Sequence, residues 1–483
     1  MQSRGNYING RFVAPDAEQE LVSINPATGA CLGRVAASTA AVGLAVEAAK
    51  RAQPAWAQQP VAARVAAVRA LAEVLSARGD ELAVCISREM GKPVWEARTE
   101  VNAAIGKIEI SINAGLDLVR EVRLEDGSGY DYRPHGVLAV LGPFNFPIHL
   151  MHGHVIPGLL LGNSVVLKPS EHTPFCGQIY AEIFDSAGLP AGVFNLVQGA
   201  APVGAALAAH EQVNAVLFTG SYAAGVAISK ANVTQPGKLL ALEMGGKNPA
   251  IVLPDAPLDK ALHDVAWGAY VTSGQRCSGT GLCFVERSIY DGFVSRLSDM
   301  LSGIQIGDPS SDVFMGPLAF AAARDKLERS LAQAVTAGAK RVATSACPEG
   351  AAFAPATLHE VRDFDPEDPY IAEEIFGPDL AVVPVDSLQQ AIAHANSLPY
   401  GLSASVFTAD AARFEHARTR LEYGCINHNA PTCGASSKLP FGGLKRSGNH
   451  RPAALWSSLY CAYPVASIRG PSERGKLSPG LNW

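Results

Sequence analysis

Apolar residues recur at helical spacing along the first quarter of the chain. Segments 40–57 and 81–98 are alanine-rich and place apolar side chains three and four positions apart, which predicts a series of amphipathic helices. Segment 101–121 continues this pattern. The polar stretch 125–135 (EDGSGYDYRPH) then interrupts it and predicts an exposed hairpin or arm.

Further along, short apolar runs bounded by turn residues alternate with helical segments. This alternation is typical of βαβ units and predicts a parallel sheet covered by helices on both faces. The runs are 136–143, 164–170, 193–199, 215–221 and 249–255.

A second α/β region is predicted to begin near residues 242–249. It contains a helix around 259–275 and strands at 282–288, 379–385 and 402–408. The tail after PFGGLKRSG is rich in Pro, Ser and Gly, which predicts an extended C-terminal segment.

Composition limits the class of protein. The 483 residues exceed what one hydrophobic core usually supports, so two or three sub-domains are expected. Hydrophobic residues make up 48% and charged residues 17%, which is typical of a well-packed globular enzyme. The net charge is −6 and no basic run stands out, so a nucleic-acid partner is not expected.

Location and metal content are also constrained. The start of the chain lacks the apolar core of a signal peptide, and no segment suits a membrane span, so no membrane partner is expected. The nine cysteines are scattered and never form a CxxC pair, which argues against a disulfide framework and a zinc site. A reducing, cytoplasmic compartment is the simplest interpretation.

Two strand ends are candidates for binding a phosphorylated cofactor. In FTGSYAAG, Phe218, Thr219, Gly220 and Ser221 end a strand, and the helix that begins there and contains Gly225 would offer backbone N–H groups and a positive helix end to a phosphate. The spacing differs from the usual G-x-G-x-x-G motif, and a plain strand-to-helix turn explains it as well.

LKPSEHTP supplies a second such strand end. Lys168 is placed to reach a phosphate or a ribose hydroxyl, with Ser170 beside it, and Glu171 is placed to accept hydrogen bonds from a ribose diol. A carboxylate there would repel a 2′-phosphate, which favours NAD over NADP. The alternative is a solvated Lys–Glu pair on a turn.

Three residues elsewhere are suited to catalysis at a carbonyl group. Asn145, between two prolines in GPFNFP, can donate to a developing oxyanion, although an Asx turn is the ordinary explanation. Glu243, before the glycine pair of LEMGGKNP, would be a general base if burial raised its pKa. Cys277, in SGQRCSGTG, has small neighbours that admit a carbonyl, but a buried structural cysteine is also compatible.

The three histidines of HLMHGH resemble a metal site by spacing alone. No acidic residue accompanies them and Pro157 follows closely, so we expect them to support the loop behind Asn145.

Together these motifs resemble the aldehyde dehydrogenase superfamily, from about residue 7 to about residue 466. The order is that of the family: GPFNFP, LKPSE, FTGS, LEMGGKNP, GQRCS, EEIFGP, YGLSASVFT and PFGGLKRSG. The resemblance implies that Cys277 is the nucleophile, Glu243 the base and Asn145 the oxyanion donor. It also implies that Glu374 and Phe376 of EEIFGP hold the nicotinamide ribose and border the nicotinamide.

The resemblance further implies an α/β fold in three parts. These are a Rossmann-type, parallel-sheet NAD-binding domain (1–119 and 139–243), an α/β catalytic domain (244–440), and a β oligomerisation arm with the C-terminal tail (120–138 and 455–483). A homodimer, or a dimer of such dimers, is the expected assembly.

The mechanism implied by the resemblance has two stages. The Cys277 thiolate attacks the aldehyde, the Asn145 amide and the Cys277 backbone N–H hold the oxyanion, and hydride leaves for the nicotinamide. Glu243 then activates water to hydrolyse the resulting thioester.

Within the superfamily, residues 133–171, LALEMGGKNP and the SGNHRP turn are similar to a branch that oxidises an N-succinylated glutamate semialdehyde in arginine catabolism. The chain departs from that branch at His428 and Ala430, in a segment (425–435) expected to line the substrate path. A substrate with several carboxylates needs cationic donors; Arg276, Arg446 and Arg451 are candidates, and each is equally compatible with a surface or interface position.

Four rival functions are distinguishable. A non-enzymatic binding or structural protein would lack some of the catalytic groups, and here none is missing. Another semialdehyde or aliphatic aldehyde would keep the same residues. A CoA-acylating relative would not need the base Glu243, and a cysteine hydrolase would need a histidine beside Cys277.

Overall fold

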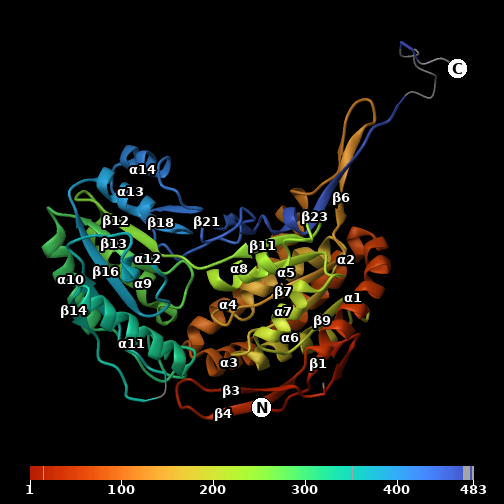
Figure 1. Ribbon diagram of the computed structural model, residues 1–483, viewed down its shortest axis with the longest axis horizontal. Helices are drawn as coiled ribbons and strands as arrows, with labels where there is room; N and C mark the ends of the chain where they lie inside the picture. Colours follow the sequence, from red (N-terminus) through yellow and green to blue (C-terminus); the bar gives the residue numbers. More distant parts are fainter. Residues whose placement is uncertain (15, 351, 471–478, 481–483) are drawn as a thin grey trace.

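Two seven-stranded sheets form the framework of the protein (Figure 1). This computed structural model describes residues 1–14, 16–350, 352–470 and 479–480. Among the described residues, no helix has the length and apolar character needed to cross a membrane.

The first sheet has the strand order β11-β10-β7-β8-β9-β1-β2. The five strands from β11 to β9 run parallel, and β1 pairs antiparallel with β9. The strands are β11 (Leu239–Glu243), β10 (Ala215–Thr219), β7 (Val137–Leu141), β8 (Ser164–Lys168), β9 (Phe194–Leu196), β1 (Asn6–Ile8) and β2 (Arg11–Val13).

Helices cover this sheet, and their buried faces form its core. Strands β7 and β8 are buried along their whole length, which explains the unbroken apolar sequence of β7 and the apolar centre of β8. The helices are α1 (Ala40–Gln58), α2 (Val61–Ala77), α3 (Gly79–Met90), α4 (Val94–Ile110), α5 (His149–Leu160), α6 (Pro174–Ser186), α7 (Ala201–Ala209) and α8 (Tyr222–Ala231).

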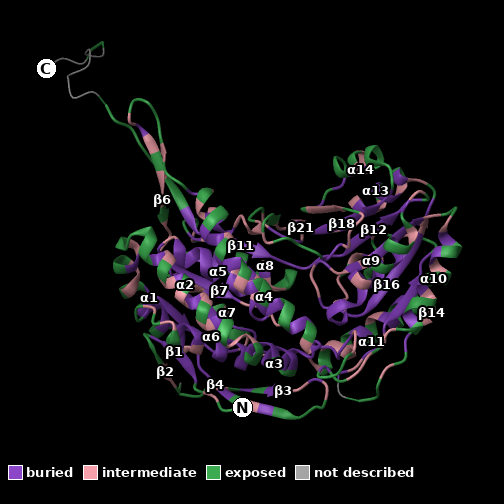
Figure 2. Cartoon of the chain, turned by 180° about the vertical axis from the view of Figure 1, so that it is seen from behind, coloured by how far each residue is buried: buried purple, intermediate pink, exposed green. Residues whose placement is uncertain are grey.

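The second sheet has the order β14-β15-β16-β13-β12-β18-β19 and is parallel except for β14. Its strands are β14 (Lys340–Thr344), β15 (Thr357–Glu360), β16 (Asp379–Val385), β13 (Thr280–Glu286), β12 (Asn248–Val252), β18 (Ser403–Phe407) and β19 (Cys425–His428). Its principal helices are α9 (Leu258–Tyr270), α10 (Tyr290–Ser302), α11 (Ala321–Thr336), α13 (Leu388–Ser397) and α14 (Ala411–Arg418). Each sheet and its helices form one unit of the protein. In both units the strands are largely buried and exposed residues gather on the outer helices (Figure 2).

A three-stranded arm projects from the first unit (Figure 1). The strands β5 (Val122–Arg123) and β6 (Gly129–Pro134) form the hairpin, and β23 (Ala462–Ser467) pairs antiparallel with β6. Two segments over 300 residues apart in sequence therefore share one small sheet. Residues 471–478 and 481–483 of the predicted tail lie outside the described residues, and the domain boundaries stay a prediction.

The register of the first sheet brings the candidate site together. Leu141 pairs with Lys168, and Thr219 pairs with Glu243. Because parallel strands end at the same edge, the loop carrying Asn145 and the two predicted cofactor motifs all leave the sheet beside Glu243.

Truncation of a core aromatic tests this framework. Phe194 is buried and stacks on Phe184 with ring centroids 3.8 Å apart, so Phe194→Ala leaves a cavity beneath the first sheet. We expect the free energy of unfolding to fall by about 3–5 kcal/mol, measured by denaturant titration. Val233→Ala, at a side chain that is 78% exposed, is the control and should change it by less than about 0.5 kcal/mol.

Candidate active site

Cys277 lies in the connection between α9 and β13, just after a strained turn. Thr272 and Ser273 have φ values of 59° and 53°, in the left-handed region that non-glycine residues rarely adopt, and each costs about 1–3 kcal/mol. Gly274 follows with φ 68°, and a Cβ there would lie 2.1 Å from the carbonyl oxygen of Gly377. The surrounding structure must therefore hold this turn in place.

Asn145 lies across from this turn, in the loop that follows β7. Its side chain is buried, and Nδ2 donates to the carbonyl oxygen of Gln275 at 2.9 Å. This hydrogen bond holds the Asn145 amide beside the backbone two residues before Cys277, where it can act as a donor near the thiol.

Glu243 ends β11 with its carboxylate out of water. It is 5% exposed, and Oε2 has no hydrogen-bond partner. A Cβ on Gly442 would lie 2.8 Å from Oε1, so a glycine is needed beside the carboxylate. Burial raises the pKa of Glu243 well above its ordinary value, which suits a group that takes up protons near neutrality.

Asn449 holds the strand that carries Glu243. Its Oδ1 accepts from the Leu242 amide at 2.9 Å, and its Nδ2 donates to the Leu240 carbonyl at 2.8 Å. The SGNHRP turn is distinctive in the sequence, but the sequence alone predicted no role for Asn449. The turn's unusual sequence was the available signal.

Glu374 is brought to the same place by the glycine pair after Glu243. Its Oε1 accepts from the Gly246 amide at 3.0 Å, and a Cβ on Gly245 would lie 2.1 Å from Oε2. Burial raises the pKa of Glu374 to about 7.

The environment of Cys277 disfavours its thiolate. Burial, together with the charges of Glu374 and Glu243, raises the pKa of the thiol to about 12, while Ser278 N–H and Arg276 act in the opposite direction. Among the described residues, no histidine contributes to this shift. The thiol is therefore protonated at neutral pH in this state, and the nearby proton acceptors are carboxylates.

The predicted cofactor residues lie on the neighbouring strand ends. Lys168 Nζ donates to the Gly199 carbonyl at 2.8 Å and to Glu171 at 3.2 Å, and burial lowers the pKa of Lys168. The Ser170 hydroxyl accepts from the His172 amide. The Ser221 hydroxyl caps α8 by accepting from the Ala224 amide at 3.3 Å.

The start of α8 lies close to Glu243. The Gly220 amide donates to the Glu243 carbonyl, and a Cβ on Gly225 would lie 2.4 Å from the sulfur of Met244. Residues 221–223 are exposed, so the helix start faces solvent and fits an anionic group.

Phe376 belongs to an aromatic cluster with Phe144, Phe320 and His172, none of which was predicted from the sequence as a site residue. It meets Phe144 edge-on at 5.8 Å, and Phe144 also contacts Phe320, which stacks on His172 with ring centroids 3.9 Å apart. The cluster links the EEIFGP loop to the loop of Asn145.

Two of the three histidines of α5 have side-chain partners, and the buried Nδ1 of His149 has none among the described residues. His152 bonds to Tyr180 at 2.8 Å, and His154 bonds to Tyr460 at 2.8 Å and Thr219 at 3.4 Å. Within the described parts of the chain, the one group with metal-ligand proximity is Cys85, Glu89 and Cys176, where Glu89 already accepts from Ser23 and the start of α6.

Comparisons with known proteins identify the family of the chain. Residues 12–462 match the aldehyde dehydrogenase family. The chain belongs to the aldehyde dehydrogenase family. It is 41% identical to N-succinylglutamate 5-semialdehyde dehydrogenase of Novosphingobium aromaticivorans (96% of this chain, 99% of the relative) and 42% identical to that of Chromobacterium violaceum (98% and 99%).

Solved structures agree on the fold of this aldehyde dehydrogenase. Lactaldehyde dehydrogenase from Escherichia coli superposes with a TM-score of 0.91 at 32% identity, covering 96% of this chain and 98% of the other. Aldehyde dehydrogenase C from Pseudomonas syringae, complexed with NAD+ and octanal, gives 0.91 at 31% identity, covering 96% of each chain. The predicted α/β, aldehyde dehydrogenase-like fold is confirmed.

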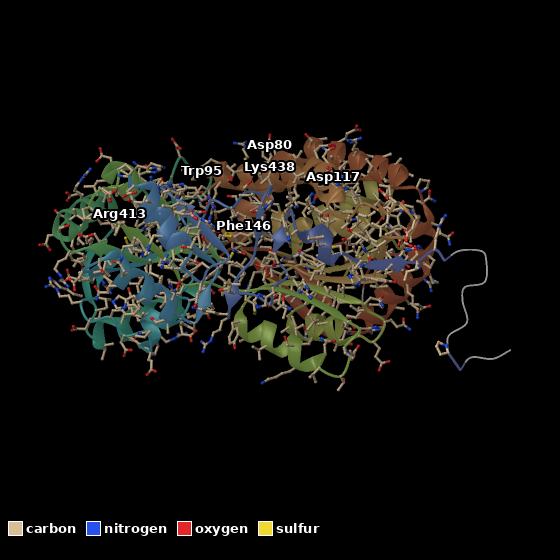
Figure 3. The ribbon with its side chains drawn as sticks, turned by 90° about the horizontal axis from the view of Figure 1, so that it is seen from above. Asp80, Trp95, Asp117, Phe146, Arg413 and Lys438 are labelled. Atoms are coloured by element: carbon tan, nitrogen blue, oxygen red, sulfur yellow. The ribbon has the colours of Figure 1, made fainter. Side chains whose placement is uncertain are left out.

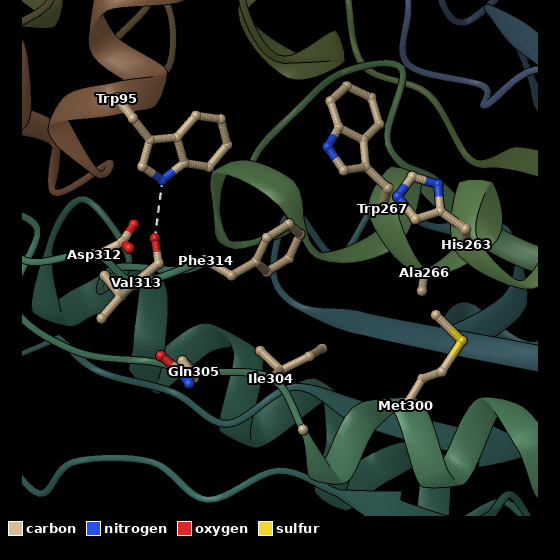
Figure 4. Close-up of a pocket in the computed structure, with 11 residues that line it drawn as sticks. Trp95, His263, Ala266, Trp267, Met300, Ile304, Gln305, Asp312, Val313 and Phe314 are labelled. Carbon is tan, nitrogen blue, oxygen red and sulfur yellow. Dashed lines mark hydrogen bonds between the residues drawn. The ribbon is translucent and has the colours of Figure 1, made fainter.

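The aldehyde dehydrogenase has an aromatic pocket of about 620 Å³ near Arg276 (Figure 4). Trp95 and Trp267 border it from α4 and α9, with Phe314 and Met300, and Trp95 Nε1 donates to the Val313 carbonyl at 2.9 Å. The Trp267 ring lies 5.2 Å from the Arg276 guanidinium.

The three candidate arginines differ in placement. Arg276 is mostly buried and paired with Glu96 at 2.9 Å. Arg446 pairs with Glu373 and lies over Tyr222, while Arg451 is exposed beside the carbonyl of His450. Arg276 alone of the three is adjacent to Cys277 in sequence.

His428 points toward α14. Its ring stacks on Phe414 with centroids 4.3 Å apart and bonds to the Thr408 carbonyl at 3.0 Å. The departure from the branch pattern at His428 therefore concerns packing against α14.

Removing the charge of Glu374 should make Cys277 more reactive. Glu374 is the charge that raises the thiol pKa most, so Glu374→Gln lowers that pKa and increases the thiolate fraction at pH 8. We expect alkylation of Cys277 by iodoacetamide to accelerate about tenfold, equivalent to one pKa unit, as measured by peptide mass spectrometry. Glu373→Gln, at the exposed neighbour, is the matched control, and equal rates in the two variants would contradict the assignment.

Proposed function

We propose that this aldehyde dehydrogenase oxidises N-succinyl-L-glutamate 5-semialdehyde to the carboxylate with NAD. The observation that carries the chemistry is Glu243 Oε2, which is buried without a partner at the end of β11, where the charge of Glu243 acts on the Cys277 thiol. The substrate rests on relatives of that name at 41% and 42% identity over nearly the whole chain.

The residues on the strand ends fit NAD. The capped, exposed start of α8 suits a pyrophosphate, Lys168 and Glu171 suit a ribose, and the Glu171 carboxylate disfavours a 2′-phosphate. Phe218, Thr219, Gly220, Ser221 and Gly225 would form the floor of this site. Glu374 and Phe376 would hold the nicotinamide end. Bound NAD supplies the hydride acceptor.

The chain's own residues perform the covalent steps. The Cys277 thiol releases its proton to solvent, and the thiolate attacks the aldehyde carbon and forms a thiohemiacetal. The second N–H of the Asn145 amide and the Cys277 backbone N–H donate to the oxyanion. After oxidation leaves a thioester on Cys277, Glu243 accepts a proton from the attacking water, and the carboxylate is released.

The arm is the proposed surface for a homodimer, or a dimer of such dimers. Leu124, Tyr130, Tyr463 and Ile468 are exposed on or beside its strands. We also retain a cytoplasmic location, supported by nine cysteines that are all free thiols.

One observation favours a second candidate, the oxidation of a less polar aldehyde. The pocket near Arg276 includes Trp95, Trp267, Phe314 and Met300 in its lining, and the Arg276 charge is already compensated by Glu96.

Substitution of the two central residues tests the mechanism. Cys277→Ala should reduce turnover at least about 10³-fold, whereas Glu243→Gln should keep a first-turnover burst of NADH and slow steady-state turnover by about 10²–10⁴-fold. Rapid-mixing absorbance at the NADH band separates the two. Normal turnover in Cys277→Ala would overturn the assignment.

The pH dependence follows from the burial of Glu243. Its pKa is raised, so the carboxylate becomes protonated, and unable to accept a proton, as pH falls through a value well above its ordinary 4.5. We expect an acid limb at that pH in the wild-type rate of thioester hydrolysis, and its loss in Glu243→Gln.

A substrate panel tests the specific aldehyde. We expect kcat/KM for N-succinylglutamate semialdehyde with NAD to exceed that for glutamate semialdehyde, succinate semialdehyde and propanal by at least about tenfold. A tenfold preference for propanal would favour the second candidate and leave the mechanism intact. Parallel assays with NADP check the cofactor preference.

A further inference from the structure

Helix α4 presents two buried carboxylates to the two loops that carry the candidate catalytic groups. Glu96 and Glu100 are four residues apart, so they lie on one face of the helix, and they are 1% and 2% exposed. The helix belongs to the first unit, while one of the two loops leads into the second.

Glu100 holds the loop that follows Asn145. Its Oε1 accepts from the amides of Ile148 and His149 at 2.8 and 3.1 Å, where α5 begins. Its Oε2 accepts from Lys92 Nζ at 2.8 Å, and both side chains are fully buried. A carboxylate at the start of a helix satisfies amides that the helix itself leaves unbonded.

Glu96 holds the strained turn before Cys277. Its Oε1 accepts from Arg276 Nη2 at 2.9 Å and from the Thr272 hydroxyl, and Arg276 Nε donates to that hydroxyl at 2.6 Å. Because Thr272 has a positive φ, these contacts stabilise a backbone conformation that the residue would not otherwise keep.

The two anchors are joined through the residue after Asn145. The Phe146 ring has Lys92 Nζ 3.8 Å from its centroid and Arg276 Cζ 5.0 Å from it. Phe146 lies where the two units meet (Figure 3). Glu96, Glu100, Arg276 and Lys92 thus form a charged cluster that contacts Phe146, called the frame below. Each cation pairs with one carboxylate and lies near the ring.

We infer that Glu96 and Glu100 are positioning residues, which fix the separation of the Asn145 and Cys277 loops from a single helix face. Glu96 acts through Thr272 and Arg276, and Glu100 acts through the start of α5. The frame explains why Arg276, next to the nucleophile, is occupied by a partner within the chain. The inference rests on the proposed roles of Asn145 and Cys277.

The functional consequence concerns reaction geometry. The thiol and the oxyanion donor must meet one carbonyl group, and displacement of either by about 1 Å can cost about 100-fold in rate. Loss of the frame should therefore lower kcat more than it raises KM.

Thr272 provides the sharpest test, because its hydroxyl can be removed without changing side-chain shape. With NAD and propanal, a neutral aldehyde, we expect Thr272→Val to lower kcat about 10- to 100-fold while KM changes less than about threefold. Thr272→Ser restores the hydroxyl and should return kcat to within about threefold of wild type. Glu109→Gln, at an exposed carboxylate on the same helix, is the matched control and should behave as wild type.

Glu96→Gln gives a signature that simple unfolding would not. It leaves the Arg276 charge uncompensated beside Cys277, and that charge lowers the thiol pKa, so iodoacetamide alkylation of Cys277 should accelerate at least about threefold while kcat falls. Peptide mass spectrometry and the thermal midpoint are measured on the same samples.

Wild-type kcat in Thr272→Val would overturn the inference, as would equal losses in Thr272→Val and Thr272→Ser. If Glu96→Gln does not fold, the Thr272 pair decides the question alone. Normal turnover in Cys277→Ala would instead refute the proposed function, so the two failures are distinguishable.

Discussion

The chemistry of this chain depends on carboxylates that are removed from water where the two units meet. Three buried carboxylates and the half-buried Glu374 lie there, and they are compensated differently. Glu96 and Glu100 are paired with Arg276 and Lys92, and Glu374 bonds to a backbone amide. Glu243 has no cationic partner among the described residues, and its Oε2 accepts no hydrogen bond. Glu96 and Glu100 are each paired with a cation and suit structural tasks, whereas burial raises the pKa of both Glu243 and Glu374, as suits a proton acceptor.

The first sheet supplies this arrangement through its register. Thr219 pairs with Glu243 and Leu141 with Lys168, so the strand ends align at one edge. The second unit contributes the Cys277 turn and the loop of Glu374, and the glycine pair Gly245–Gly246 lets both approach closely. The reacting groups therefore come from both units, and their geometry depends on contacts that cross between them.

The proximity of Arg276 to Cys277 shows how sequence adjacency can mislead. An arginine next to a nucleophile is a natural candidate for binding a substrate carboxylate. In the folded protein its guanidinium is held by Glu96 and Thr272 and lies between the rings of Phe146 and Trp267. Its charge is thereby neutralised by Glu96 within the chain, and its contacts stabilise the turn before Cys277.

The sequence by itself determined the α/β fold, the family, and the motifs at the strand ends, because these depend on local periodicity and on short segments of fixed chemistry. It predicted Asn145, Glu243 and Cys277 as candidates without placing them. Only the tertiary structure decided that Asn449 fixes the strand of Glu243, and that Glu96 reaches a turn 176 residues away. Burial and pairing of charges depend on residues distant in sequence, so no local pattern could have specified them.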